Sequence, residues 1–295
     1  QPRGGAIFTN TTAVGATMTI TGCTFVNNQA QGTGGNAGQG GAIAHANGTL
    51  NVSLSRFFKN SAPGGGSAVW QQVIIGSSTI AENNWWGCDN FPAGSPCQTA
   101  DGAVDSDPRI DLKLTASPST INLGGTSTLT ADVSMNTNDV VVSPAVMVGL
   151  PITFDGPFGS VGPGSSTISA GFGATSTYTN ATCPGSPNIN NTSATVDSGT
   201  QIAGVTVQQP PQLSACPTNI SAGNDPNVCG ATLSYTAPTA TQGCPPPTVD
   251  CSPPSNSLFA IGTTTVTCVA ANGVAQNDTC EFTVTVADTQ KPLIV

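Results

Sequence analysis

Side chains able to carry out acid–base chemistry are scarce in the first third of the chain. Residues 1–87 contain no aspartate, and their charged side chains are Arg3, Arg56, Lys59 and Glu82. A single carboxylate cannot act as both the acid and the base that glycoside cleavage requires. His45, the one histidine of the chain, has no acidic residue near it in sequence to orient it. We therefore predict that the chain is not an enzyme and that His45 is a surface side chain.

Four aspartates follow closely after this carboxylate-poor segment. Carboxylate oxygens are the ligands that Ca²⁺ prefers, so such a run could hold a calcium ion that stiffens a connection between domains. The alternative is a solvated acidic turn around Pro108, because the spacing is not that of an EF-hand loop. The candidate ligands are Asp101, Asp105, Asp107 and Asp111. We predict no other cofactor.

Ten cysteines indicate an oxidising, extracytoplasmic compartment. The single histidine and the lack of a C-x-x-C pair argue against zinc and against covalently bound haem. Cys88 and Cys97 enclose a short Pro- and Gly-containing loop, so we predict a local disulfide between them. Cys23 and Cys183 have no obvious local partner. They could be buried free thiols, pair with each other, or link to another chain.

The remaining six cysteines all lie in the last third of the chain. Sequence alone leaves their pairing open. Cys268 and Cys280 flank a loop between two strongly predicted strands, which makes a cross-strand bridge between them the simplest expectation. The six disulfide candidates are Cys216, Cys229, Cys244, Cys251, Cys268 and Cys280.

Composition predicts an all-β extracellular protein. Charged residues make up 7% of the chain, Gly and Pro number 35 and 23, and the strong helix formers are scarce. The net charge is −9 with only 6 Lys and Arg, which argues against nucleic-acid binding because that needs a basic face. No apolar run is long enough to span a membrane. We expect a secreted or cell-surface location.

Two short patterns recur along residues 1–87. The segment Gly4–Phe8 returns as Gly40–Ala44, and Thr24–Asn28 returns as Arg56–Asn60, with looser copies further on. Short strands separated by Gly turns and a recurring Asn predict a stack of parallel coils, with the Asn side chains forming a ladder. This pattern resembles the right-handed parallel β-helix repeats of bacterial secreted and surface proteins, a fold family that also includes pectate-lyase-like enzymes.

The stretch Asn83–Asp111 is expected to end these coils. Two tryptophans, Trp85 and Trp86, lie here, and flat aromatic rings can cover the open end of a solenoid. We therefore assign residues 1–111 to a short β-helix with a C-terminal cap. The start of the chain shows no matching cap, which makes it the expected place for a partner.

Two β-sandwich modules are predicted after this stretch. Residues 112–209 show about seven short alternating strands and resemble the bacterial Ig-like modules of invasin-type adhesins. Residues 210–288 carry a more specific pattern, including Gly262–Cys268 and Cys280–Val286, and resemble the hyalin repeat (HYR), an extracellular Ig-like module linked to adhesion. Residues 289–295 are expected to be a linker or a donated strand, with Leu293, Ile294 and Val295 able to join a neighbouring sheet edge.

Eight Asn-x-Ser/Thr sequons mark candidate glycosylation sites. They are Asn10, Asn47, Asn51, Asn180, Asn190, Asn191, Asn219 and Asn277. In a chain so rich in Thr and Asn, many such matches arise by chance.

Together these features predict an all-β, rod-like surface, matrix or filament protein without catalysis: a short right-handed parallel β-helix followed by two Ig-like sandwiches. Its expected partners are copies of itself or further modules joined end to end, and cell-surface or matrix glycans. The alternative is a fragment of a β-helix polysaccharide lyase or hydrolase, or a glycan-binding module. For the last, Trp70 is the candidate contact, although a packed role is the simpler expectation for it.

Overall fold

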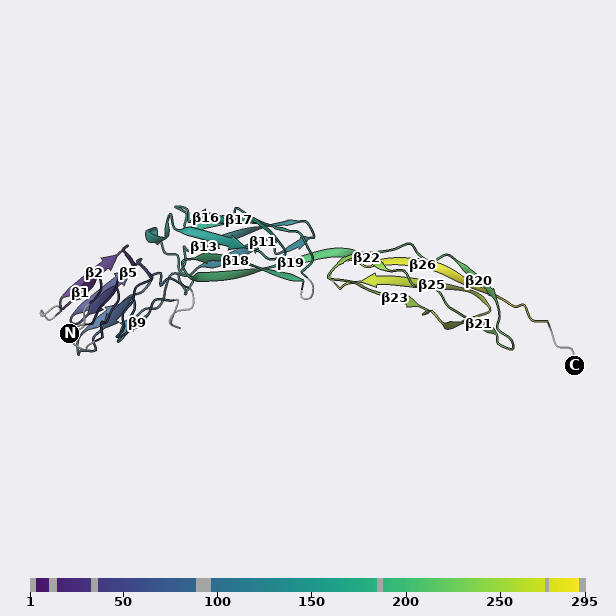
Figure 1. Cartoon of the computed structure of the whole chain (residues 1–295), viewed down its shortest axis with the longest axis horizontal. Coiled ribbons are helices and arrows are strands. Elements are labelled where there is room, and N and C mark those ends of the chain that lie inside the picture. The colour runs from purple at the N-terminus through teal and green to yellow at the C-terminus, as the bar shows by residue number, and fades with distance from the viewer. Residues whose placement is uncertain are drawn as a thin grey trace. The chain divides into compact units, whose positions relative to one another are not determined.

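The computed structural model describes residues 4–10, 15–32, 37–88, 97–184, 188–273 and 276–291 (Figure 1). By mutual contacts the chain divides into two compact units. Unit 1 comprises residues 1–118, 126–179 and 191–204, and unit 2 comprises residues 119–125, 180–190 and 205–295. Among the described residues the one helical element is a 3-10 turn, η1 (Ala145–Met147). The described residues therefore contain no helix that could span a membrane. The all-β prediction is confirmed.

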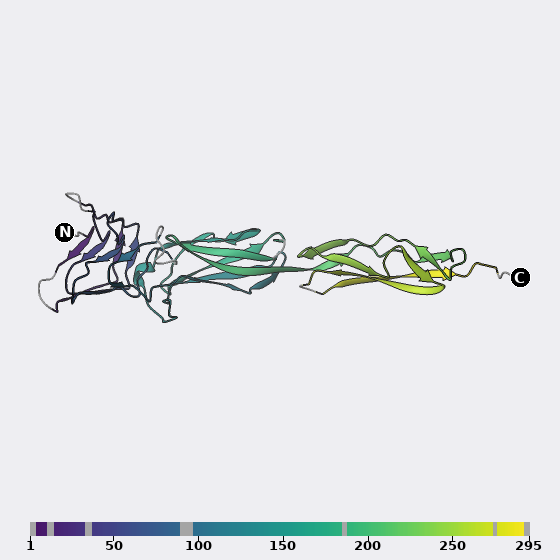
Figure 2. The same cartoon turned by 90° about the horizontal axis from the view of Figure 1, so that it is seen from below.

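The first part of unit 1 consists of parallel sheets built from successive passes of the chain. The first sheet has the order β1-β4-β7-β9 and the second β10-β8-β5-β2, while β3 pairs with β6. Every pairing between these strands is parallel (Figure 2). The strands are β1 (Ile7–Thr9), β2 (Thr17–Thr21), β3 (Thr24–Val26), β4 (Ile43–His45), β5 (Thr49–Ser53), β6 (Arg56–Phe58), β7 (Val69–Gln71), β8 (Ser78–Ile80), β9 (Ala100–Asp101) and β10 (Val104–Asp105).

Stacked aromatic rings and bonded amides hold these passes in register. The rings of Phe25 and Phe57 stack with centroids 5.0 Å apart, and Phe57 stacks on Trp86 at the same spacing. The predicted Asn ladder is also present, because Asn28 Nδ2 donates to Asn60 Oδ1 at 2.9 Å. Each pass therefore presents the same side-chain positions to the next one, as repeat architectures require.

Residues 113–213 form strands with buried and exposed side chains alternating, most clearly along β13 and β17. One sheet has the order β11-β13-β17-β15, and the other contains the path β12-β19-β18-β14-β16. The seven strands expected from sequence each have a counterpart. The strands are β11 (Lys113–Ser117), β12 (Thr120–Asn122), β13 (Thr126–Asp132), β14 (Pro151–Asp155), β15 (Gly159–Gly162), β16 (Ser165–Thr167), β17 (Gly173–Asn180), β18 (Ile189–Val196) and β19 (Gly199–Leu213).

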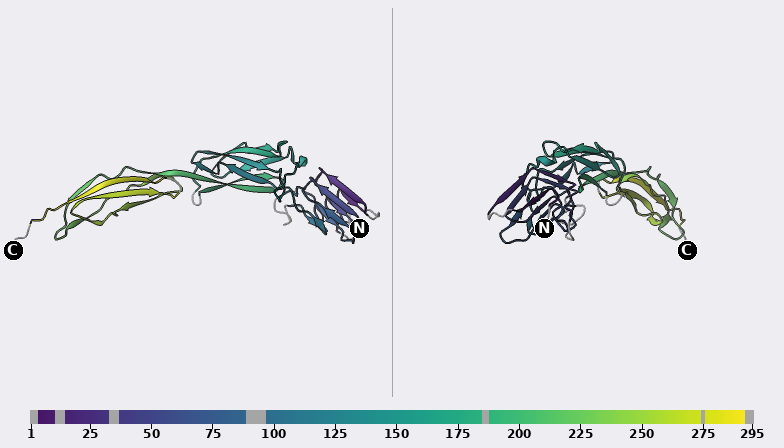
Figure 3. Two further views of the ribbon diagram at one scale, coloured as in Figure 1. Left: turned by 180° about the vertical axis from the view of Figure 1, so that it is seen from behind. Right: turned by 60° about the vertical axis from the view of Figure 1, so that its left-hand side comes forward.

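The last module has one four-stranded sheet, β20-β26-β25-β23, and a separate pair, β21-β24. The long hairpin β25–β26 is visible from behind in Figure 3. Its inward side chains Val266, Phe282 and Val284 form the core with Phe259, and Tyr235 packs edge-on against Phe282. The strands are β20 (Ile220–Gly223), β21 (Gly230–Leu233), β22 (Ala240–Cys244), β23 (Thr248–Ser252), β24 (Ser257–Ala260), β25 (Gly262–Ala271) and β26 (Asp278–Ala287).

Candidate functional sites at two joints between modules

A buried charge network joins the parallel coils to the first sandwich within unit 1. Asp197 lies in the two-residue turn between β18 and β19 and adopts a left-handed backbone with φ 54°. Its carboxylate accepts hydrogen bonds from Arg56 Nε at 2.9 Å, from Arg56 Nη2, and from Trp85 Nε1 at 2.8 Å. The Arg56 and Asp197 side chains are only 10% and 7% exposed. We call Arg56, Trp85 and Asp197 the hairpin joint.

Further hydrogen bonds surround the hairpin joint. Ser198 N donates to Gly87 O at 2.9 Å, which fixes the turn against the end of the coils. Asn136 Nδ2 donates to Asn83 Oδ1 at 2.8 Å. A planar guanidinium bound by both ends of one carboxylate restricts orientation as well as distance. The coils and this part of the sandwich therefore form one compact unit.

Trp85 and Trp86 lie in the interior, with no measurable exposure. Trp86 extends the ring stack of Phe25 and Phe57, whereas Trp85 donates to Asp197. The two indoles thus contact the coil core on one side and the hairpin turn on the other. The turn that contains Asp197 packs against this end of the coils. The sequence predicted a cap of tryptophans here but not this contact with the sandwich.

The four aspartates considered as calcium ligands do not come together in the structure. Asp101 Oδ2 accepts a hydrogen bond from Gly66 N, and Asp107 Oδ1 accepts from Arg109 Nη1 at 3.0 Å. Asp105 is exposed on β10, and Asp111 is half-buried. Because each carboxylate has its own surroundings, the described residues contain no group of three His, Cys, Asp or Glu side chains able to hold a metal ion.

Asp111 nevertheless predicts a pH-dependent stability. Burial raises the pKa of its carboxyl group, while the charges of Lys113 and Arg109 oppose that rise. Because the folded-state pKa lies above the unfolded one, the ionised carboxylate destabilises the fold at neutral pH. This penalty vanishes as the pH falls below about 3.9, the unfolded-state value. Asp111→Asn should therefore raise the thermal unfolding midpoint at neutral pH, with a difference that shrinks in acid.

Calorimetric melts over a pH series would measure this difference, with the exposed Asp105→Asn as control. A lower midpoint for Asp111→Asn than for the wild type at neutral pH would contradict the prediction.

A second connection lies within unit 2 and consists of a disulfide and a shared strand. Cys183 bonds to Cys244 with their Cα atoms 5.6 Å apart, so the expectation that Cys183 lacks an intramolecular partner or pairs with Cys23 is wrong. The long strand β19 pairs with β12 and β18 and also with β22. Asn272 Nδ2 donates to Gln209 O at 2.8 Å. We call the Cys183–Cys244 bond with the β19–β22 pairing the disulfide joint.

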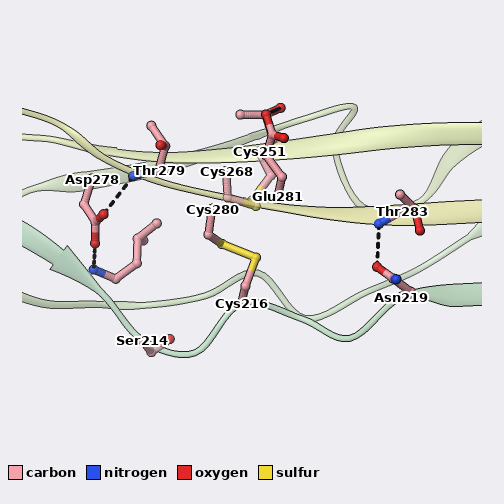
Figure 4. Close-up of a disulfide and its surroundings, with 12 residues drawn as sticks. Ser214, Cys216, Asn219, Cys251, Cys268, Asp278, Thr279, Cys280, Glu281 and Thr283 are labelled. Carbon is pink, nitrogen blue, oxygen red and sulfur yellow. Dashed lines mark hydrogen bonds between the residues drawn. A yellow bond between two sulfur atoms is a disulfide. The ribbon is translucent and has the colours of Figure 1, made fainter.

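Two further disulfides brace the last module (Figure 4). Cys251 bonds to Cys268 and Cys216 bonds to Cys280, so the expected Cys268–Cys280 bridge is wrong. Cys268 faces Cys251 on one side and Cys280 on the other in the sheet register. A residue of a central antiparallel strand forms the closer, non-hydrogen-bonded pair with only one neighbour. The 4.0 Å Cα–Cα distance shows that this neighbour is Cys251.

Of the other cysteine predictions, one is confirmed and one is wrong. The Cys88–Cys97 bond is confirmed. Cys229, expected in a disulfide, is a free and exposed thiol, as is Cys23. Cys23 N donates to Ser55 Oγ in the next coil. The Cys23 thiol donates to the carbonyl of Thr21, two residues before it.

His45 is buried, so its prediction as a surface side chain is wrong. Its Nε2 donates to the Gly48 carbonyl at 3.0 Å, and Nδ1 therefore accepts from the Thr9 hydroxyl. Both ring nitrogens are occupied, which leaves neither available as a general base. Trp70 is half-buried in β7, in register with Ala44 and Asp101.

The sequons differ in accessibility. Asn180 and Asn190 are buried, so their amides cannot meet a glycosyltransferase in the folded chain. Asn10, Asn191, Asn219 and Asn277 are exposed, and Asn47 and Asn51 are half-buried. The tail residues Leu293, Ile294 and Val295 lie outside the described residues.

Comparison with known proteins identifies one module. Residues 207–286 match the HYR domain family, which confirms that resemblance. No curated protein matches the chain. Among solved structures, it is similar to a chain in the crystal structure of Dpr2 Ig1–Ig2 in complex with DIP-Theta Ig1–Ig3, with 11% identity, 59% of this chain and 66% of that chain covered, and a TM-score of 0.34.

Two other similar structures are an intimin fragment and Sidekick-1. The C-terminal 282-residue intimin fragment, in complex with the intimin-binding domain of its translocated receptor, shows 17% identity over 59% of this chain and 63% of that chain, with a TM-score of 0.30. Sidekick-1 immunoglobulin domains 1–5 show 16% identity over 68% and 45%, with a TM-score of 0.35. Because all three TM-scores are below 0.5, the function proposed for this chain depends on its own residues.

Proposed function

We propose that the chain is an extracellular structural or adhesive segment without catalysis, which holds a short right-handed parallel β-helix, an Ig-like sandwich and an HYR module in series. Its task is to set the spacing and orientation of surfaces, with copies of itself or further modules as end-to-end partners. The observation that supports this most is that both connections are braced. One has a buried ion pair and the other a disulfide with a shared strand.

The free-energy cost of bending a connection depends on the contacts that cross it. Modules linked by a plain Gly/Ser or polar linker move independently, because few contacts cross it. At the hairpin joint, a hinge motion would break the charge-assisted Arg56–Asp197 hydrogen bonds and the Trp85–Asp197 hydrogen bond together. At the disulfide joint, the Cys183–Cys244 bond and the pairing of β19 with β22 oppose the same motion. Such bracing suits a load-bearing or spacing role better than a flexible enzyme linker.

Small-angle X-ray scattering of residues 1–295 tests the proposal. A compact globule of this length would have a radius of gyration of about 19 Å. An extended, stiff chain should give a clearly larger radius and a narrow distribution of particle lengths in electron micrographs. A radius close to the compact value would overturn the proposed role. Measurable turnover of acidic polysaccharides by the same chain would overturn its non-catalytic part.

A further inference from the structure

A hollow of about 440 Å³ lies beside the hairpin joint, within unit 1. Its volume falls in the range of roughly 300–1,000 Å³ that is typical of small-molecule sites. Residues that line it come from the coils and from the hairpin turn, and include Lys59, Ser67, Gln98, Thr99 and Ser198. Neither the network at Asp197 nor the proposed spacing role uses these side chains.

Gln98 offers a fixed hydrogen-bond donor to the hollow. The residue is 4% exposed, and its Oε1 accepts a hydrogen bond from Asn60 N at 2.8 Å. That bond orients the amide, because a backbone N–H needs an acceptor and so fixes which end of the amide is oxygen. The Nε2 group has no hydrogen-bond partner among the described residues. Because Gln98 lines the hollow, this amide nitrogen can donate to a ligand that accepts hydrogen bonds.

Ser67 offers a second donor. Its Oγ accepts from Thr99 N at 2.7 Å and from Thr99 Oγ1 at 3.2 Å, while Ser67 N donates to Thr99 Oγ1 at 2.8 Å. With both acceptor positions of Ser67 Oγ occupied, the hydroxyl hydrogen remains to donate outward. The reciprocal bonds also hold both side chains in one orientation.

Lys59 adds an unpaired positive charge. Its backbone is left-handed, with φ 53°, and its Nζ lies 5.0 Å from the centre of the Phe58 ring. In the described part of the chain no carboxylate forms an ion pair with it, whereas the neighbouring Arg56 is neutralised by Asp197. The Lys59 side chain is exposed, so its charge is open to a ligand in the hollow. It favours an anionic ligand.

We propose that this hollow binds a carboxylate-bearing saccharide unit, such as a hexuronate. Lys59 and Gln98 Nε2 bind the carboxylate, and Ser67 and Ser198 contact sugar hydroxyls. The combination of three donors and hydroxyl side chains, with no lining carboxylate, suits an acidic sugar and disfavours an apolar ligand. This inference goes beyond the proposed spacing role, which would stand even if the hollow bound nothing.

The test is a titration of the full, ¹⁵N-labelled chain with D-glucuronate, followed by NMR of the side-chain amides. The Gln98 signal is identified by its loss in Gln98→Glu, which keeps an acceptor for Asn60 N but replaces the donor with a negative charge. Glucuronate should shift the Gln98 amide in a saturable manner. Glucose and acetate at equal concentration should not.

Three variants complete the design. Lys59→Gln should weaken glucuronate binding about tenfold or more, which corresponds to the loss of one charge-assisted contact. Gln98→Glu should abolish binding, as followed by isothermal titration calorimetry. Lys113→Gln removes a lysine far from the hollow in sequence and should leave the affinity unchanged. Melting curves verify that each variant is folded.

Several outcomes would overturn the proposal. One is a glucuronate titration that leaves the Gln98 amide unmoved. Another is acetate binding as tightly as glucuronate, which would reduce the site to a general anion site. Unchanged glucuronate affinity in a folded Lys59→Gln variant would contradict the assigned contact between Lys59 and the carboxylate. A radius of gyration near the compact value would leave this site untouched and would overturn only the spacing role.

Discussion

Asp197→Asn is expected to lower the free energy of unfolding of the unit that contains the hairpin joint by about 3 kcal/mol. Asparagine tolerates the left-handed backbone of Asp197 and keeps an oxygen for Trp85 Nε1, so the change removes mainly the negative charge. Arg56 then remains buried with no counter-charge, which is the costly consequence. Urea unfolding followed by tryptophan fluorescence measures the effect, since Trp85 and Trp86 both lie at this position.

A matched control comes from an exposed ion pair of the same unit. Lys113 pairs with Asp139 at the surface, and exposed pairs contribute only about 0–1 kcal/mol, so Asp139→Asn should change stability little. The double variant Arg56→Met/Asp197→Asn removes the buried charge altogether and should recover much of the lost stability. Equal effects of Asp197→Asn and Asp139→Asn would contradict a buried, stabilising pair.

The second large effect is expected at the disulfide joint. Cys183→Ala/Cys244→Ala opens a loop of sequence separation 61 and should reduce the stability of unit 2 by about 4 kcal/mol. Thermal unfolding without reductant measures this loss. Limited proteolysis should also show faster cleavage near β22, because the β19–β22 pairing is then the main remaining restraint there.

Cys88→Ala/Cys97→Ala is the matched control, because it removes a disulfide of separation 9. The shorter loop predicts a loss smaller by roughly 1–2 kcal/mol. Thiol titration of the denatured wild type should find the two free cysteines, Cys23 and Cys229. A larger loss for the control pair than for Cys183→Ala/Cys244→Ala would contradict the assigned role of the joint.

Local patterns predicted the strands and the ladder positions well. The Asn28–Asn60 bond follows from a repeated Asn at a bend, and the Cys88–Cys97 bond follows from nearness in sequence. The HYR match also depends on spacing within one short module. Each of these features depends on residues within one turn, one hairpin or one repeat, so a local sequence pattern is enough to predict it.

The sites at the joints could not be predicted in the same way. Arg56 and Asp197 are 141 positions apart, and Cys183 and Cys244 are 61 apart. Nothing in either local pattern marks these residues as partners. The burial of His45 was missed for a related reason, because its inward orientation depends on the coil stacked against it and on Thr9.

The amino-acid sequence was enough to predict the all-β class, the repeated parallel strands and the HYR module, because composition, repeat period and residue spacing can be recognised within short segments. Contacts between distant segments were needed to show which carboxylate neutralises Arg56, which sulfur bonds to Cys183, and that Lys59 has no ion-pair partner in the described part of the chain. The reason is that electrostatic and covalent pairing depend on distance in space. That distance is fixed only when separate strands pack together.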